Sequence, residues 1–223
     1  MLQTAALILA AGKGTRMHSD KPKVLQTVLG EPMLRYVLEA VRPVFDGRVL
    51  VVVGHQAGMV EAAFPEASFV HQEQQLGTGH ALMQAMPALE GQCERVLVVN
   101  GDTPLLSEDV VRHFVEASEG ADLAFATIEL DDPAAYGRVV RAADGSVRAI
   151  VEAKDYDPAL YGPEPHEVNA GMYCVRLDLA ARLLPRIGNA NKSGEYYITD
   201  LISLAVAEGC KVQGVQCGRD ESL

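Results

Sequence analysis

Short apolar runs alternate with amphipathic stretches over the first 130 or so positions of the chain. The run at residues 5–11 (AALILAA) ends in glycine and has the continuous hydrophobicity of a strand that is buried on both faces. Pro32 opens a stretch with an apolar stripe at helical spacing. The pattern predicts strands at 5–11, 49–53, 68–71, 95–100 and 122–128, and helices from Pro32 and at 79–88 and 108–119. Strands that alternate with helices indicate a mostly parallel sheet with helices on both faces.

The pattern changes after about residue 133. Residues 139–141 and 147–152 flank Asp144-Gly145, which is a hairpin signal. Further strands are predicted at 168–175 and 212–215, and helices at 178–184 and 199–208. No linker, repeat or low-complexity stretch interrupts the chain. We therefore expect one α/β domain over residues 1–223, Rossmann-like in its first half, with its ligands at the carboxyl ends of the strands.

Composition narrows the classes of partner. Hydrophobic residues make up 48% of the chain, and the formal net charge is −11. Such an acidic surface disfavours nucleic acid or an anionic membrane as the main partner. No apolar run approaches the roughly 20 residues that a membrane span needs. Four cysteines without a C-x-x-C pair are typical of reduced thiols, so we expect a soluble cytoplasmic protein.

A glycine-rich segment, residues 9–17 (LAAGKGTRM), directly follows the first predicted strand. Glycines allow a sharp turn that points several N–H groups at one anion. A dinucleotide fingerprint would need a third glycine where Met17 stands, and the P-loop pattern is absent. The segment is therefore either a phosphate-binding loop of another type or a plain tight turn.

Charged residues near the predicted strand ends have structural as well as functional interpretations. Arg16, Lys21 and Lys23 beside the glycine loop suit a triphosphate, and they equally suit a solvated basic face. Asp102 follows the strand at 95–100, where a carboxylate serves as a turn residue, a helix cap, or one oxygen ligand of Mg²⁺. Glu152 taken alone is typical of a surface charge at a strand end.

The motifs together resemble those of the sugar-1-phosphate nucleotidyltransferases, whose signature is L-A-A-G-x-G-T-R-M followed by K-P-K. Within that family the chain is similar to the uridylyltransferase domain of the bacterial bifunctional N-acetylglucosamine-1-phosphate uridyltransferase/glucosamine-1-phosphate acetyltransferases. The most specific segments are residues 75–81 (QLGTGHA) and 194–200 (GEYYITD). The other matching segments are 100–105 (NGDTPL), 136–138 (YGR), 150–155 (IVEAKD) and 168–173 (VNAGMY).

The resemblance implies a Mg²⁺-dependent reaction. UTP and N-acetylglucosamine-1-phosphate would give pyrophosphate and UDP-N-acetylglucosamine, a precursor of bacterial peptidoglycan and lipopolysaccharide. Asp102 would bind the Mg²⁺, and Arg16 and Lys23 would offset phosphate charge during catalysis. The implied nucleotide contacts are Leu9, Ala10, Ala11 and Gly12 through their backbone, Gln72, Gly77 and Thr78 at the base, and Asn100 and Gly101 near the ribose and phosphate. The implied sugar contacts are Gly137, Glu152, Asn169, Tyr197 and Thr199.

Longer family members continue with a helical arm and a β-helix that carry acetyltransferase activity, trimer contacts and a second magnesium ligand. For this chain we therefore expect no acetyl transfer, a mostly monomeric state and weak handling of metal. The sequence is consistent with a fragment and with a naturally short chain. Two alternative functions remain, which are transfer of another nucleotide (a thymidylyl- or guanylyltransferase) and a catalytically weak nucleotide-sugar binding module.

Overall fold

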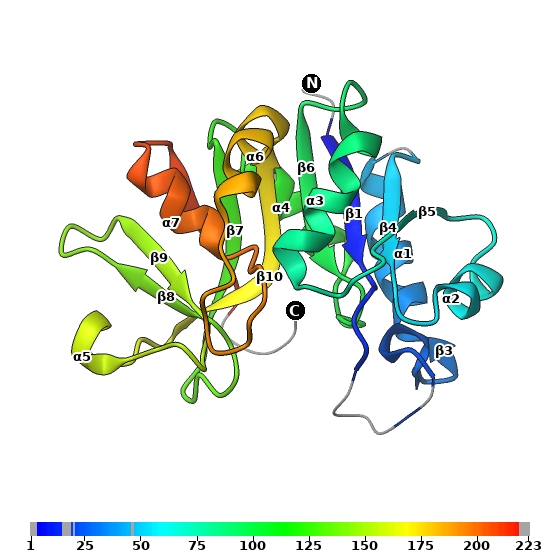
Figure 1. The fold of residues 1–223 in the computed structure, drawn as a ribbon, viewed down its shortest axis with the longest axis horizontal. Helices are drawn as coiled ribbons and strands as arrows, with labels where there is room; N and C mark the ends of the chain where they lie inside the picture. Colours follow the sequence, from blue (N-terminus) through cyan, green and yellow to red (C-terminus); the bar gives the residue numbers. More distant parts are fainter. Residues whose placement is uncertain (1–3, 15–18, 20, 46, 219–223) are drawn as a thin grey trace.

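The computed structural model describes residues 4–14, 19, 21–45 and 47–218. Over these residues the centre of the molecule is a nine-stranded sheet, whose main path runs β11-β7-β10-β6-β1-β4-β5 (Figure 1). The strands of this path are β1 (Thr4–Leu9), β4 (Val49–Val53), β5 (Ser68–His71), β6 (Arg95–Asn100), β7 (Leu123–Glu129), β10 (Glu167–Arg176) and β11 (Val212–Gly218). A hairpin of β8 (Arg138–Arg141) and β9 (Val147–Val151) joins the sheet through β10.

The directions of the strands determine which loops lie together at each edge of the sheet. The pairs β1–β4, β4–β5, β1–β6 and β7–β11 are parallel, whereas β10 is antiparallel to both of its neighbours, β6 and β7. Six of the seven strands on the main path therefore run the same way. Their carboxyl ends, and the beginning of β10, lie at one edge of the sheet. A mostly parallel sheet, as the sequence predicts, is confirmed.

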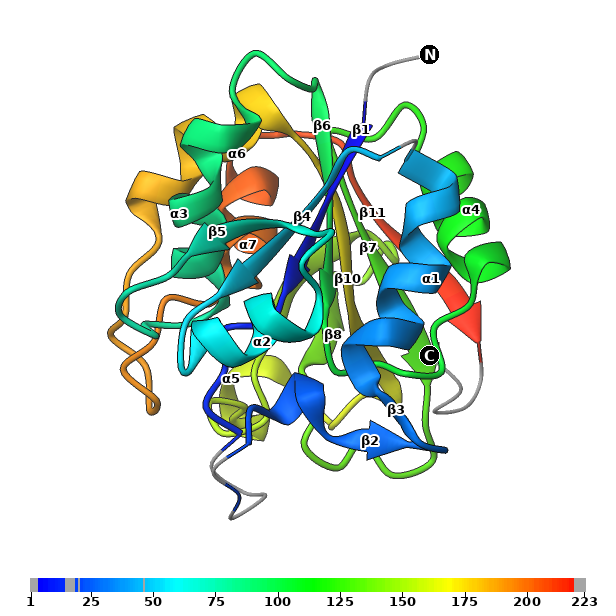
Figure 2. The same ribbon diagram turned by 90° about the vertical axis from the view of Figure 1, so that its right-hand side faces the viewer.

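Helices cover both faces of the sheet, as Figure 2 shows nearly edge-on. The helices α3 (Thr78–Leu89), α6 (Leu177–Leu183) and α7 (Asp200–Ala207) contribute to one core cluster, and α1 (Met33–Phe45), α2 (Ala57–Ala63) and α4 (Glu108–Ala117) contribute to the other. Short elements complete the described chain, namely η2 (Lys23–Leu25), β2 (Thr27–Val28), β3 (Glu31–Pro32), α5 (Pro158–Tyr161) and η3 (Leu184–Arg186). None of the helices in the described ranges has the length and apolar character to cross a bilayer.

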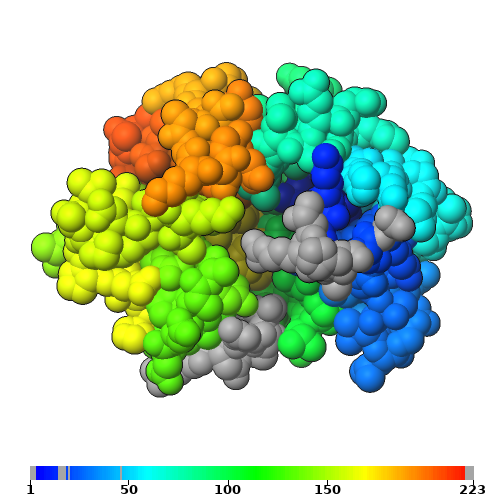
Figure 3. All heavy atoms as spheres, turned by 60° about the horizontal axis from the view of Figure 1, so that its bottom comes forward, coloured from blue at the N-terminus to red at the C-terminus, as the bar shows by residue number. Residues whose placement is uncertain are grey.

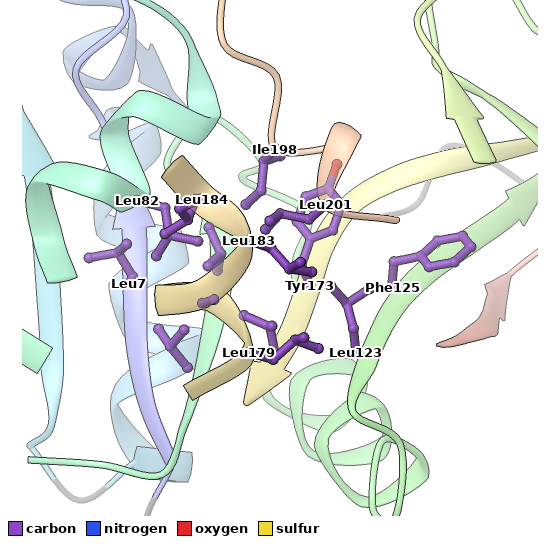
Figure 4. Packing of buried hydrophobic residues seen from close by; sticks show 14 of the residues in the cluster. Leu7, Leu82, Leu123, Phe125, Tyr173, Leu179, Leu183, Leu184, Ile198 and Leu201 are labelled. Atoms are coloured by element: carbon purple, nitrogen blue, oxygen red, sulfur yellow. The ribbon is translucent and has the colours of Figure 1, made fainter. Parts of the chain in front are cut away.

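The two cores follow from the alternation of side chains along each strand. In β1, Leu7 faces the cluster with α3, α6 and α7, whereas Ile8 faces the cluster with α1, α2 and α4. Both side chains are fully buried. Figure 4 shows the first cluster, where Leu7 and Leu82 lie near Leu183 and Leu184. Burial of each such leucine contributes roughly 1.5–3 kcal/mol to folding, so both faces anchor the sheet that carries the loops.

The apolar pattern located most elements. The predicted strands at 49–53, 68–71 and 95–100 have the bounds of β4, β5 and β6, and the other predicted helices and strands agree to within a few residues. The α2 helix and the β2–β3 hairpin were not predicted. The α2 segment is only seven residues long, and Gln56, which precedes it, is left-handed and provides no side-chain cap. Such a helix has no boundary signal in the sequence.

Candidate active site

The carboxyl edge of the sheet gathers the motifs that the sequence singled out. The glycine loop follows β1, Gln72 follows β5, and Asn100 ends β6. Asn169 lies near the start of the antiparallel β10 and so reaches the same edge from the opposite direction. Figure 3 looks onto this edge, where a hollow lies between the blue and cyan segments on one side and the yellow-green and orange segments on the other.

A cleft of about 450 Å³ occupies the side formed by the first half of the chain. Ten of the predicted site residues line it, namely Leu9, Ala10, Ala11, Gly12, Lys23, Gln72, Gly77, Thr78, Asn100 and Asp102. Gly101 lies between two of these residues and is buried against β1, where its N–H donates to the carbonyl of Leu9 at 2.9 Å. Arg16 falls outside the described residues. The structure thus brings the predicted nucleotide contacts into one place.

Lys23 and Asp102 form an ion pair at this cleft. Gly14 has a φ of +58°, and a Cβ on it would lie 2.8 Å from the Cβ of Lys23, so only glycine lets the loop pass this close to the lysine. The side chains of Lys23 and Asp102 are 42% and 27% exposed. A cation and an anion at the cleft therefore both remain open to solvent and to a ligand.

Gln72 is the most buried polar group of the cleft, with 3% of its surface exposed. Its amide nitrogen donates to the carbonyl oxygen of Gly77 at 3.1 Å and lies 3.0 Å from Nδ1 of His80. Gln75 donates to the backbone carbonyl of Gln72 at 2.9 Å. The glutamine is therefore held at both its backbone and its side chain.

The turn before α3 is tied to the segment that precedes α7. Gly77 has a φ of +112°, and a Cβ there would lie 2.6 Å from the carbonyl oxygen of Tyr196. Backbone hydrogen bonds join Tyr196 N to Leu76 O at 2.8 Å and Gly79 N to Tyr196 O at 2.8 Å. The Thr78 hydroxyl accepts from the N–H of Ile198 at 3.0 Å. The predicted base-reading turn thus touches the segment that carries two predicted sugar contacts.

Three of the five predicted sugar residues, Glu152, Tyr197 and Thr199, line a second hollow of about 320 Å³. The other two, Gly137 and Asn169, lie beside Glu152 but line neither hollow. The Thr199 hydroxyl donates to Glu152 Oε1 at 2.9 Å, and Asn169 N donates to Gly137 O at 2.8 Å. The site is therefore two hollows joined by the segment before α7, a division that the sequence did not predict.

Asn169 is held inside an irregular stretch of β10. Its Nδ2 donates to the hydroxyl of Tyr173 at 2.7 Å, and its Oδ1 accepts from the N–H of Gly171 at 3.0 Å. The pairing register between β10 and β7 shifts between Asn169 and Tyr173. An amide has two N–H groups and two lone pairs, so Asn169 keeps one donor and one acceptor for a ligand.

Three carboxylates face the second hollow, Glu152, Asp155 and Asp200. Burial raises the pKa of Glu152, although the hydrogen bond from Thr199 opposes this. Burial, reinforced by the charges of Glu152 and Asp155, raises the pKa of Asp200 to about 6. Mutually repelling acids in a partly buried hollow favour a ligand that presents hydrogen-bond donors, such as sugar hydroxyls.

Several residues of the two hollows were not predicted. Lys13, Gln75 and Glu195 line the cleft, and Asp155 and Asp200 line the second hollow. Gln75 and Glu195 stand in the two most specific motifs, so motif membership was the signal that could have identified them. His80 stands in the same motif as Gln75, but only the fold reveals its contact with Gln72.

A larger hollow than either of these, of about 1060 Å³, lies at the opposite edge of the sheet. Its lining includes Met83, Met86, Leu184 and Pro185, and it contains none of the predicted site residues. Size alone is a poor guide here, because a site for phosphates needs convergent N–H groups and charges. The smaller cleft is lined by the glycine-rich loop, Lys23 and Asp102, and we assign the function to it.

The cleft suits a hard divalent cation that is bound together with phosphates. Within the described ranges, no group of three His, Cys, Asp or Glu side chains could hold a metal ion. Mg²⁺ needs only one or two carboxylates and takes its other ligands from phosphates and water. Asp102 offers one such carboxylate at the cleft, where the ammonium of Lys23 already neutralises it. The residues present therefore fit a metal that arrives with a nucleotide.

The sheet, the glycine loop after its first strand and the carboxylate beyond β6 define an α/β nucleotide-binding protein. The sequence profile of the MobA-like NTP transferase domain matches residues 6–161, and the chain belongs to this family of nucleotidyltransferases.

Similar proteins include bifunctional proteins that are named GlmU. The chain is 64% identical over 223 residues to the GlmU of Nitratidesulfovibrio vulgaris strain Hildenborough, and the match covers 99% of the chain and 49% of that protein. It is 45% identical over 220 residues to the GlmU of Lawsonia intracellularis, covering 97% and 48%. The chain thus spans about half the length of the curated relatives it matches. The resemblance to the uridyltransferase half of these proteins is confirmed.

Solved structures share the fold at low sequence identity. An inositol-1-phosphate CTP transferase from T. maritima superimposes with a TM-score of 0.75 at 16% identity, covering 97% of this chain and 86% of the other. A putative glucose-1-phosphate thymidylyltransferase from Bacillus anthracis gives 0.73 at 18% identity, covering 96% and 86%. These similarities confirm the α/β fold class that the sequence predicts.

Proposed function

We propose that this chain transfers uridylyl from UTP to N-acetylglucosamine-1-phosphate and releases pyrophosphate. The observation that carries the proposal is the meeting of the glycine loop, Lys23, Gln72 and Asp102 in one cleft, beside a second hollow that contains Glu152 and Thr199. The 64% identity to a GlmU protein supports the choice of uridine and of the amino sugar. We also propose that residues 1–223 form one domain that is monomeric in solution, and light scattering tests the monomeric state. We further propose a cytoplasmic location.

The proposed chemistry is one in-line displacement. A phosphate oxygen of the sugar-1-phosphate forms a bond to the α-phosphorus of UTP, and the bond from that phosphorus to the bridging oxygen breaks. The nucleophile is already an anion at neutral pH, so the step needs no general base. Positioning and charge neutralisation are then the main tasks of the protein.

The residues of the cleft divide these tasks. The backbone of residues 9–12 contacts the nucleotide, although the N–H of Ala10 is already donated to the carbonyl of Val52. Gln72 and the Gly77–Thr78 turn hold the base, and Lys23 offsets charge on the departing pyrophosphate. Asp102 would hold Mg²⁺, which when bound supplies charge neutralisation between two repelling phosphates. Glu152 and Asn169 would orient the sugar hydroxyls and the acetamido group. Arg16 is proposed to act with Lys23.

A pyrophosphate-release assay tests the proposal. The chain is supplied with Mg²⁺ and with each pairing of UTP, dTTP, CTP, GTP or ATP with N-acetylglucosamine-1-phosphate, glucose-1-phosphate or glucosamine-1-phosphate. We expect the highest kcat/KM for UTP with N-acetylglucosamine-1-phosphate. Equal turnover with ATP contradicts the base assignment, and binding of UDP-N-acetylglucosamine without turnover identifies a binding module instead.

A further inference from the structure

We infer that His80 is a positioning residue that fixes the side-chain amide of Gln72 in one orientation, so that its carbonyl oxygen reads the N3–H of uracil. The inference rests on the proposed function for the identity of the base. It concerns how the site distinguishes uracil from cytosine, a property that the glutamine alone cannot provide.

A free glutamine side chain is ambiguous toward pyrimidines. Uracil presents a donor at N3, whereas cytosine presents an acceptor there. An amide carries an acceptor oxygen and a donor nitrogen on one planar group, so a rotation of 180° lets the same glutamine pair with either base. Selectivity for uracil therefore requires something that prevents the rotation.

Two contacts of Gln72 prevent it. The carbonyl oxygen of Gly77 can only accept, so the amide group that faces it at 3.1 Å must be the nitrogen. The second N–H of that nitrogen faces Nδ1 of His80 at 3.0 Å, which must accept and therefore carries no proton. Reversal would place the amide oxygen against the Gly77 carbonyl oxygen and against a ring nitrogen lone pair, two repulsive contacts around a side chain that is only 3% exposed.

The orientation leaves the carbonyl oxygen of Gln72 available. Both amide hydrogens are used by Gly77 and His80, and among the described residues no donor to Gln72 Oε1 is found. Gln72 also lines the cleft. A base edge with an N–H group can supply the missing donor, and a base edge with a lone pair there cannot.

His80 is itself held in place. It lies in the first turns of α3, where its partly buried ring lies 6.3 Å from the ring of Tyr196, centroid to centroid. The amide nitrogen of Gln84, one helical turn later, lies 3.4 Å from Nε2. With Nδ1 unprotonated, the neutral ring carries its proton on Nε2, and the exposed amide of Gln84 accepts that proton once it turns to present its oxygen instead.

The test is a comparison of UTP and CTP in three variants. His80→Phe keeps a ring but removes the acceptor, His80→Asn places its Oδ1 near the position of Nδ1, and His113→Phe removes an exposed histidine of α4 as a control. In the pyrophosphate-release assay we expect His80→Phe to lower the ratio of kcat/KM for UTP to that for CTP by about tenfold or more. The His80→Asn variant should recover most of the ratio, and His113→Phe should leave it unchanged.

Other outcomes separate the inference from the proposed function. An unchanged ratio in His80→Phe, or equal losses with UTP and CTP that His80→Asn does not rescue, overturns the role of His80. If the parent chain turns over no nucleotide, the proposed function fails, and the same variants are compared by calorimetric binding of UMP and CMP. The ¹⁵N shifts of the His80 ring in the parent protein are a readout that needs no variant. A protonated Nδ1 at neutral pH overturns the inference.

Discussion

The residues of the cleft with the clearest chemical role are a pair, Lys23 and Asp102. An ion pair that is this exposed contributes roughly 0–1 kcal/mol to stability. Either partner can therefore exchange the other for a ligand at little cost to the fold. Lys23 would then bind a phosphate, and Asp102 would bind a metal ion.

We predict that Asp102→Asn lowers kcat by roughly 10² at limiting Mg²⁺ and leaves the thermal midpoint unchanged. Asparagine has nearly the same shape but no charge, and removing one electrostatic contact to a reacting phosphate typically costs about 10²–10³ in rate. Steady-state rates against Mg²⁺ concentration measure this. Asp109→Asn on the exposed side of α4 is the control, and near-parent activity of Asp102→Asn would refute the metal role.

A second residue-scale prediction concerns the pH dependence of stability. Burial and like charges raise the pKa of Asp200 to about 6 from its ordinary value of 3.8. Between these values the folded state binds the proton more tightly than the unfolded state does, so the contribution of Asp200 is full below pH 3.8 and is lost as the pH rises through 6. Asp200→Asn should therefore gain in free energy of unfolding, relative to the parent, as the pH rises from 4 to 7.

Urea denaturation of the parent and Asp200→Asn at several pH values measures that difference. Asp178→Asn is the matched control, because the hydrogen bond from Arg176 lowers the pKa of Asp178. The Asp178→Asn difference should be flat between about pH 5 and 8, since that carboxylate stays ionised in both states there. A flat difference for Asp200→Asn as well would show that its carboxyl is not perturbed.

At the scale of elements, the turn before α3 and the segment before α7 behave as one unit. They are distant in sequence, yet three hydrogen bonds join Leu76, Thr78 and Gly79 to Tyr196 and Ile198. The base-reading turn and the sugar-side segment consequently cannot shift independently. Binding of the nucleotide should therefore depend on the position of the sugar-side segment, and binding of the sugar phosphate on the position of the base-reading turn.

We predict that Gly77→Ala costs at least about 1 kcal/mol in free energy of unfolding and raises the KM for UTP. Its φ of +112° strains any residue with a Cβ, and that Cβ would lie 2.6 Å from Tyr196 O. Gly91→Ala is the control, because Gly91 has a φ of +73° with nothing within 4 Å of a Cβ. Equal costs in the two variants would mean that backbone strain alone matters and that the contact with Tyr196 does not.

Elements with a strong apolar pattern were predictable, and their directions were not. The strands at 49–53 and 95–100 were located because continuous burial leaves a run of valine and leucine. The strand at 168–175 was predicted as well, but a hydrophobic run is the same in either direction. Its antiparallel insertion between β6 and β7 depends on long-range packing. The division of the site into two hollows also depends on long-range packing and could not be predicted from the sequence.

For the site residues as well, individual residues could be predicted from the sequence but their contacts across the fold could not. Gln72, Asn100 and Asp102 could be named because the resemblance to the sugar-1-phosphate nucleotidyltransferases implies them. The contact between Gln72 and His80 could not, because it depends on how α3 packs beside β5. Glu152 and Thr199 are 47 positions apart and meet only through the packing of α7 on the hairpin.

On the scale of the whole molecule, the two hollows face different halves of the proposed product. We predict that UDP-N-acetylglucosamine with Mg²⁺ slows hydrogen exchange both at residues 72–79 and at 150–155, whereas UMP slows it only at 72–79. Ligand contacts stabilise the segments that they touch against local opening. Exchange measured by mass spectrometry checks this at peptide level. Equal protection of residues 150–155 by UMP would show that the sugar hollow is assigned wrongly.

The place of β10 has a consequence for synthesis on the ribosome. The strands β5, β4, β1 and β6 are complete by residue 100, but the strand that covers the free edge of β6 begins at residue 167. During the translation of the intervening residues, β6 presents unpaired N–H and C=O groups along this edge. A nascent chain of that length is a target for chaperones and for pairing with other chains. The edge of β6 can be covered only after residues 167–176 have left the exit tunnel and paired with it.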